Sequence, residues 1–150
     1  MARDLSAVDP TLHAALKRFP PVTFGPAPTR LMRFANRWVP DPVHAPDLES
    51  TRRSVPDNGR TVWIHRRHSG TSPALFWLHG GGHVIGDPEQ RRWADVLTSR
   101  VDCVMVSAGY RLSPEHPFPA SLDDAHAAFH WMLEAADDLG LDPKIGRAHV

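Results

Sequence analysis

ALFWLHGGGHVIG, residues 74–86, is the stretch of sequence that decides the fold. Its first five residues are apolar, which is typical of a short strand covered on both faces of a sheet. After the glycines, Asp87, Pro88 and Gln90 have the pattern of a helix start: a cap, a first-turn proline and a capping-box side chain. A second apolar run follows at Cys103–Val106. Strand, glycine loop, helix and strand predict a βαβ unit, which needs two parallel strands.

Further predicted elements flank this unit. Glu49–Val55 and Thr61–Arg67 enclose the turn sequence PDNG and predict an antiparallel β-hairpin. On the C-terminal side, Ser121 and Asp124 have the spacing of a capping box, which predicts a second helix. Apolar side chains at helical spacing predict the buried face of that helix: Leu122, Ala125, Phe129, Met132 and Leu133. The fold class is therefore α/β, an open sheet that combines a hairpin with a parallel βαβ unit.

The N-terminal region has a different character. Asp9 and Pro10 predict the start of a short helix, with Leu12, Leu16 and Phe19 on one face. Residues 20–47 then contain seven prolines but also aromatic side chains, which a disordered segment rarely carries. We expect residues 1–47 to form a cap or arm, and residues 48–143 to form the α/β domain.

The glycine loop allows several interpretations. A dinucleotide-binding loop needs a third glycine where Ile85 stands, and a phosphate-binding P-loop needs a lysine where Asp87 stands. An oxyanion hole fits every residue, because a loop that follows a central strand can point backbone N–H groups at a developing negative charge. A tight turn that uses glycine for its geometry alone remains the alternative. His79 and His83 have no third partner at metal-ligand spacing, so no metal is expected.

Composition excludes several classes of protein. Lys and Arg together number 17, as do Asp and Glu, so no basic field is present to attract nucleic acid or an anionic membrane. Cys103 is the one cysteine, which excludes an intrachain disulfide. The sequence shows no apolar run of signal-peptide or membrane-spanning length, and we therefore expect a cytoplasmic protein without a membrane span.

A second motif, YRLSPEHPFPA at residues 110–120, follows the glycine loop by about thirty residues. Together with LHGGGH it resembles the hormone-sensitive-lipase branch of the α/β-hydrolase carboxylesterases. The resemblance spans about residues 48–143 and implies the N-terminal half of such a domain, with residues 1–47 as the cap. One departure is Gly109, which stands where the family often has an aspartate.

The resemblance also implies a mechanism and residue roles. A serine would attack a small-molecule ester to give an acyl-enzyme, with no cofactor. The N–H groups of Gly81 and Gly82 would hold the oxyanion. His79 and Gly80 would brace the loop, and His83 would line the substrate pocket. Supporting contacts would come from the second motif, including an Arg–Glu ion pair: Tyr110, Arg111 and Glu115.

The nucleophile motif G-x-S-x-G is missing from these residues. Ser107 is interpreted as an ordinary strand-end serine, and Cys103 as an inert core thiol. The final letters, IGRAHV, match the translation of a common sequencing adapter, so we expect residues 144–150 to be a non-native tail. The chain alone is then expected to be inactive, and poorly soluble because the edge of Cys103–Val106 would be exposed. Two alternatives stay open: a genuine truncated binding module or pseudoenzyme, and an amidase or lactonase of the same fold.

Overall fold

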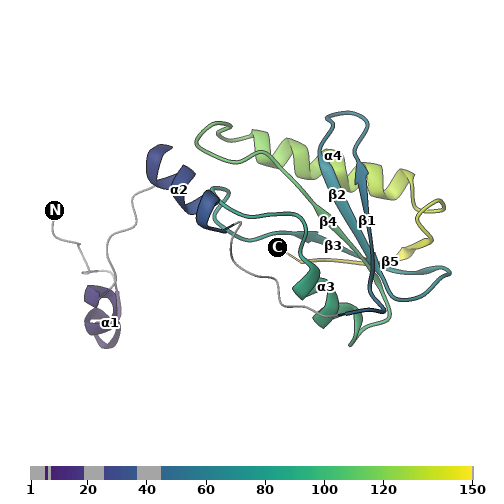
Figure 1. Ribbon diagram of the computed structural model, residues 1–150, viewed down its shortest axis with the longest axis horizontal. Helices are drawn as coiled ribbons and strands as arrows, with labels where there is room; N and C mark the ends of the chain where they lie inside the picture. The colour runs from purple at the N-terminus through teal and green to yellow at the C-terminus, as the bar shows by residue number, and fades with distance from the viewer. Residues whose placement is uncertain (1–5, 7, 19–25, 37–44, 150) are drawn as a thin grey trace.

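The structure is a computed structural model that describes residues 6, 8–18, 26–36 and 45–149. Its centre is a five-stranded sheet with the strand order β1-β2-β4-β3-β5 (Figure 1). In chain order the strands are β1 (Glu49–Ser54), β2 (Thr61–Arg66), β3 (Ser72–Leu78), β4 (Val104–Ala108) and β5 (Leu141–His149). The predicted hairpin is confirmed in the antiparallel pair β1–β2, and the predicted βαβ unit in the parallel pair β3–β4. The α/β fold class is therefore correct.

Two helices, α3 (Arg91–Thr98) and α4 (Ala120–Glu134), cover opposite faces of the sheet (Figure 1). Because successive residues of a strand point to opposite faces, β4 serves both layers. Val104 and Val106 join the core cluster that contains Met132 of α4, whereas Met105 joins the cluster that contains Ala94 of α3. This double burial explains why β4 is apolar almost throughout.

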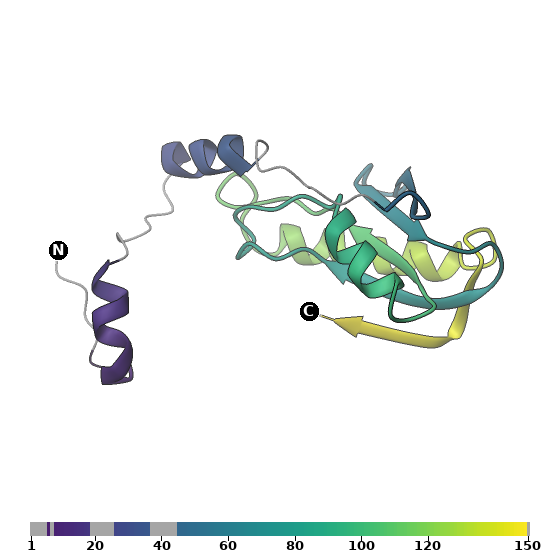
Figure 2. The same cartoon turned by 60° about the horizontal axis from the view of Figure 1, so that its bottom comes forward.

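The expectation of an exposed edge at Cys103–Val106 is wrong. β4 pairs with β2 on one side and with β3 on the other, because the hairpin joins the sheet through β2. The edge strands are β1 and β5, and β5 lies parallel to β3 (Figure 2). The backbone of β5 includes most of residues 144–150, whose non-native origin stays a prediction.

The helix starts differ from the capping patterns in the sequence. α3 begins at Arg91, after a turn in which the Asp87 carboxylate accepts the Glu89 N–H at 2.7 Å and its carbonyl accepts the Gln90 side chain at 2.6 Å. Asp87 thus orders the approach to the helix, not its first turn. α4 begins at Ala120, and Asp124 is not its cap.

The buried face of α4 is only partly as predicted. Met132 is buried and Phe129 packs against the core, but Leu122 and Leu133 are 57% and 42% exposed. Asp124 and Ala128 take their place against the sheet. The helix is rotated toward Asp124 because that carboxylate has a cationic partner in the preceding loop, which helical spacing of apolar residues does not reveal.

The N-terminal region contributes η1 (Pro10–Leu12), α1 (His13–Arg18) and α2 (Pro26–Asn36). The predicted role of Asp9 at the start of the first helix is confirmed, because its carboxylate accepts the Thr11 N–H at 2.8 Å. Leu12 is exposed, and Phe19 lies outside the described residues. α1 lies apart from the sheet, whereas α2 approaches the loops at one end of it (Figures 1 and 2). Within the described ranges, no helix has the length and apolar composition to span a bilayer.

Candidate active site

The glycine loop follows β3 and contains three consecutive residues with positive φ: Gly81 at 121°, Gly82 at 60° and His83 at 58°. A Cβ on Gly81 would lie 2.0 Å from the carbonyl oxygen of Ile85, so glycine is required there for space as well as for conformation. Two hydrogen bonds close the turn: the N–H groups of Val84 and Ile85 both donate to the Gly81 carbonyl at 3.1 Å. The loop is therefore a defined turn with a specific need for glycine.

The residues that carry the Gly81 and Gly82 amides are accessible to solvent. Both residues are exposed, and a Cβ on Gly82 would meet nothing within 4 Å. Within the described part of the chain, neither N–H donates a hydrogen bond, whereas Val84 and Ile85 donate inside the turn. The loop sits where β3 and β4 end, the edge of a parallel sheet at which α/β proteins bind ligands. Two unused donors at this edge can bind a negatively charged oxygen.

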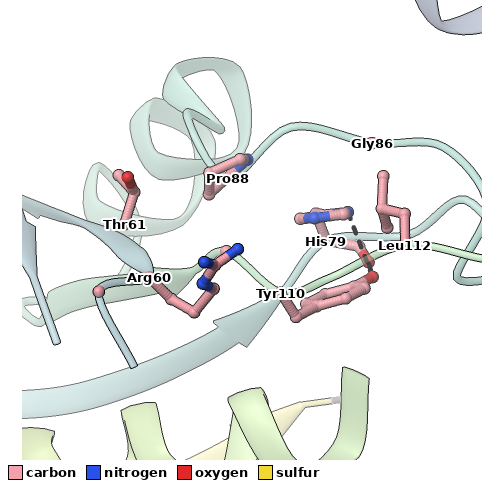
Figure 3. A pocket seen from close by; sticks show the side chains of 9 residues that line it. Arg60, Thr61, His79, Gly86, Pro88, Tyr110 and Leu112 are labelled. Carbon is pink, nitrogen blue, oxygen red and sulfur yellow. Dashed lines mark hydrogen bonds between the residues drawn. The ribbon is translucent and has the colours of Figure 1, made fainter. Parts of the chain in front are cut away.

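His79 is buried beneath this loop and braces it (Figure 3). Its Nδ1 lies 3.0 Å from the Gly80 carbonyl, and since a carbonyl only accepts, Nδ1 carries the proton. Burial lowers the pKa of His79, which keeps the ring neutral. The Tyr110 hydroxyl donates to the His79 carbonyl, and the two rings are stacked. A Cβ on Gly86 would lie 2.0 Å from the same imidazole, so the returning chain also needs glycine.

The second motif forms a loop that lies against the first. The Ser113 N–H donates to the His83 carbonyl at 2.8 Å, and the rings of His83 and Tyr110 have centroids 5.6 Å apart. The structure thus brings together residues that the sequence separates by about thirty positions. Among the eight predicted site residues, Glu115 has its described side-chain partner in α2.

The predicted ion pair between Arg111 and Glu115 is wrong. Arg111 contacts Asp124 instead: its Nε and one terminal nitrogen donate at 2.8 and 2.9 Å, and its backbone N–H donates at 2.9 Å. Glu115 pairs with Arg33 at 2.9 Å. Burial alone would raise the pKa of Asp124, but its hydrogen bonds with Arg111 outweigh burial and lower it. A carboxylate one turn inside a helix can reach back to the preceding loop, which explains the choice of partner.

Arg33 is the site residue that sequence reasoning missed. Its Nε donates to the Val84 carbonyl at 2.8 Å and a terminal nitrogen donates to the Ser113 carbonyl at 2.6 Å. The only signal in the sequence is an arginine between two apolar residues of the N-terminal arm, Met32 and Phe34. These partners lie 51 and 80 residues away, which no local pattern indicates.

A pocket of about 280 Å³ adjoins the buried side of the loop (Figure 3). Its wall includes Arg60, Pro88 and Gly109 together with His79 and Tyr110. Gly109 stands where the family often has an aspartate. Its backbone N–H has a partner here, since it donates to the Thr61 carbonyl at 2.8 Å. A Cβ at Gly109 would lie 2.8 Å from that same oxygen, so the neighbouring backbone leaves no room for a side chain at this position.

The remaining candidates have structural positions. Ser107 is fully buried inside β4, which fits its interpretation as a strand residue and not a nucleophile. Cys103 is also buried, and burial raises its pKa, as expected for an inert thiol. His126 and His130 face each other on the surface of α4, with their Nε2 atoms 3.1 Å apart. Among the described residues, no cluster of three or more metal-ligating side chains occurs.

The fold and the loop geometry define a protein of the α/β-hydrolase class, and comparison with known proteins agrees. The family model described as "alpha/beta hydrolase fold" matches residues 75–146. The chain is 35% identical over 148 residues to the carboxylesterase NlhH of Mycobacterium tuberculosis, covering 91% of this chain and 45% of that protein. It is 45% identical over 127 residues to the carboxylic ester hydrolase LipN of the same species, covering 79% and 32%.

Solved structures give the same result. The esterase LipW from Mycobacterium marinum superposes with a TM-score of 0.75 and 26% identity, covering 96% of this chain and 48% of that one. The chain spans less than half the length of these relatives. It belongs to the hormone-sensitive-lipase-like carboxylesterase family and corresponds to part of that family's fold.

Proposed function

We propose that this chain supplies the oxyanion hole of a serine carboxylic-ester hydrolase whose nucleophile, acid and base are not among these 150 residues. One observation carries the proposal: two adjacent amides, Gly81 and Gly82, are left without a described acceptor at the ligand-binding edge of the sheet. The family and its named relatives support ester hydrolysis as the reaction.

The proposed chemistry requires donors in this place. A serine oxygen attacks the ester carbonyl carbon, and the carbonyl oxygen becomes a negatively charged alkoxide. The Gly81 and Gly82 N–H groups donate to this oxygen, and a third donor is the residue after the serine. Collapse of the intermediate expels the alcohol and leaves an acyl-enzyme, which water hydrolyses to the acid. Removal of one such donor typically costs ~3–4 kcal/mol of transition-state stabilisation.

The other predicted residues have supporting roles in this proposal. His79 and Tyr110 hold the base of the loop, because the stacked rings and the hydroxyl bond fix the peptide that precedes the glycines. His83, the residue after the two glycines, would line the substrate pocket in this proposal. Arg111 fixes the second motif onto α4 through Asp124. No cofactor takes part in this mechanism, and the substrate is a small ester.

Gly81→Ala in the full-length protein tests the proposal. The new Cβ collides with the Ile85 carbonyl and displaces the turn, so kcat for a p-nitrophenyl ester is expected to fall by roughly 10²–10³. Gly70→Ala is the matched control, because Gly70 has a similar φ of 119° but nothing within 4 Å of its Cβ. Turnover that survives in Gly81→Ala would contradict the oxyanion assignment.

The alternatives predict different results. The gene sequence that follows the codon of Pro143 should contain G-D-S-A-G within some twenty codons if the chain is the first half of an esterase. A genuine stop after codon 150, confirmed in genomic DNA, would favour a truncated binding module or pseudoenzyme. Hydrolysis of anilides or lactones in preference to esters would favour the amidase or lactonase alternative.

A further inference from the structure

The guanidinium of Arg33 connects three segments of the chain. Its donors reach the carbonyl of Val84 at 2.8 Å, the carbonyl of Ser113 at 2.6 Å and the carboxylate of Glu115 at 2.9 Å. The first acceptor belongs to the glycine loop and the other two belong to the second motif. One side chain from α2 therefore holds both loops of the candidate active site.

These contacts close a ring of hydrogen bonds around the turn. The N–H of Val84 donates to the Gly81 carbonyl, and the Val84 carbonyl accepts from Arg33. Ser113 is held in the same way, since its N–H donates to His83 and its carbonyl accepts from Arg33. The ring thus fixes the residues on both sides of Gly82. Any displacement of Arg33 frees a carbonyl in each loop at once.

Arginine suits this position better than lysine. The planar guanidinium presents five N–H donors in fixed directions, and here they reach three acceptors on three different residues. A lysine ammonium carries the same charge on a flexible stem and lacks this fixed geometry. Glu115 balances the charge, and the pKa of its carboxyl is lowered first by its own backbone amide and then by Arg33.

The side chains of α2 differ in their exposure. Leu31 and Phe34 are 67% and 58% exposed, although both are large. The Arg33 side chain, in contrast, is only 25% exposed. Arg33 is therefore a partly buried residue of α2 whose polar bonds reach both loops.

We propose that Arg33 is a positioning residue, through which α2 holds the glycine loop in the conformation that presents the Gly81 and Gly82 amides. The kinetic consequence rests on the proposed function, but the effect on the loop does not. Arg33 does not touch the oxyanion; it acts by restraining Val84 and Ser113.

Hydrogen–deuterium exchange of the full-length protein tests the restraint. In Arg33→Gln, the amides of Val84, Ile85 and Ser113 are expected to exchange roughly tenfold faster. Val84 and Ser113 lose the guanidinium from their carbonyls, and Ile85 donates to the same Gly81 carbonyl as Val84. Arg33→Lys should show a similar increase, since charge alone does not reproduce three directed bonds. Arg30→Gln, an exposed arginine on the same helix, is the matched control and should leave these amides unchanged. Amides of β4 report global unfolding and should exchange as in the native protein.

The kinetic measurement follows on the same variants. A loosened oxyanion loop lowers kcat for p-nitrophenyl acetate by roughly tenfold and changes KM less than twofold, because the donors act on the transition state. Unchanged exchange in both Arg33 variants, or an equal increase in Arg30→Gln, would overturn the proposal. Exchange as slow as native in Arg33→Lys alone would overturn the role of the guanidinium geometry. A native protein that hydrolyses no ester would overturn the proposed function, while the exchange data would still decide the role of Arg33.

Discussion

The imidazole of His79 is stacked on the phenol ring of Tyr110, with centroids 4.2 Å apart and planes inclined by 12°. His79 begins the glycine loop and Tyr110 begins the second motif, so this contact joins the two sequence motifs at their first residues. The Tyr110 hydroxyl also donates to the His79 carbonyl. The position of the glycine loop therefore depends on a residue that comes thirty-one positions later.

Tyr110 should titrate above its usual range. Burial raises the pKa of its phenol, because the phenolate is penalised when it is removed from water. It is the only tyrosine in these 150 residues, so ultraviolet difference titration of the chain reports it directly. In urea the pKa should return to about 10. Equal values in the folded and unfolded chain would contradict the buried position of the ring.

Gly86→Ala should be far more destabilising than Gly59→Ala. Both glycines have positive φ, but a Cβ on Gly86 would lie 2.0 Å from the His79 ring, whereas a Cβ on Gly59 would meet nothing within 4 Å. Backbone strain alone accounts for about 1–2 kcal/mol at Gly59, and the collision adds about 1–3 kcal/mol at Gly86. Urea denaturation of the two variants measures the difference. Equal losses of stability would contradict this prediction, because they would show that the loop around His79 rearranges to accommodate the new Cβ at little cost.

Asp124→Asn should destabilise the chain by about 3 kcal/mol, since it leaves the Arg111 guanidinium without its charged partner. The neighbouring Asp123→Asn is the matched control, because Asp123 is exposed on the same helix and should cost less than about 0.5 kcal/mol. Chemical denaturation at pH 7 compares the two variants.

The same carboxylate gives stability a dependence on acid pH. The folded pKa of Asp124 is lowered, so its contribution is fully present above the unfolded value of about 3.9 and is lost as pH falls through the folded value. Asp124→Asn should therefore lose less stability than the native chain when pH falls below about 4. Parallel losses in the two proteins would contradict the pairing.

His65 should make the fold less stable in mild acid. Burial lowers its pKa from 6.5 to about 4, with a smaller contribution from the positive charge of Arg91. Between these two values the unfolded chain binds the proton and the folded chain does not, so stability falls as pH falls from 6.5 to 4. From pH 7 to pH 5 the expected loss is about 2 kcal/mol.

His65→Gln isolates this effect, because glutamine does not titrate. The slope of stability against pH should flatten in this variant, whatever the substitution costs in absolute terms. An unaltered slope in His65→Gln would assign the pH dependence to other groups.

Local patterns in the sequence predicted the hairpin, the βαβ unit and the glycine turn. The turn at residues 56–59 and the apolar runs of β3 and β4 depend on residues close in the chain, and the structure confirms all three. The need for glycine at position 81 is also local, because the atom that a Cβ would collide with belongs to Ile85, four residues later. The oxyanion role itself stays a proposal.

Tertiary structure alone decided which segments meet. β4 lies inside the sheet because β2 pairs with it. Arg111 meets Asp124 because of the rotation of α4, and Arg33 meets Val84 because α2 approaches the glycine loop. The sequence by itself determined the hairpin and the βαβ unit, since those depend on backbone conformation and neighbouring side chains. It could not determine strand order or long-range ion pairs, because charged groups and strand edges have several possible partners until packing brings one within reach.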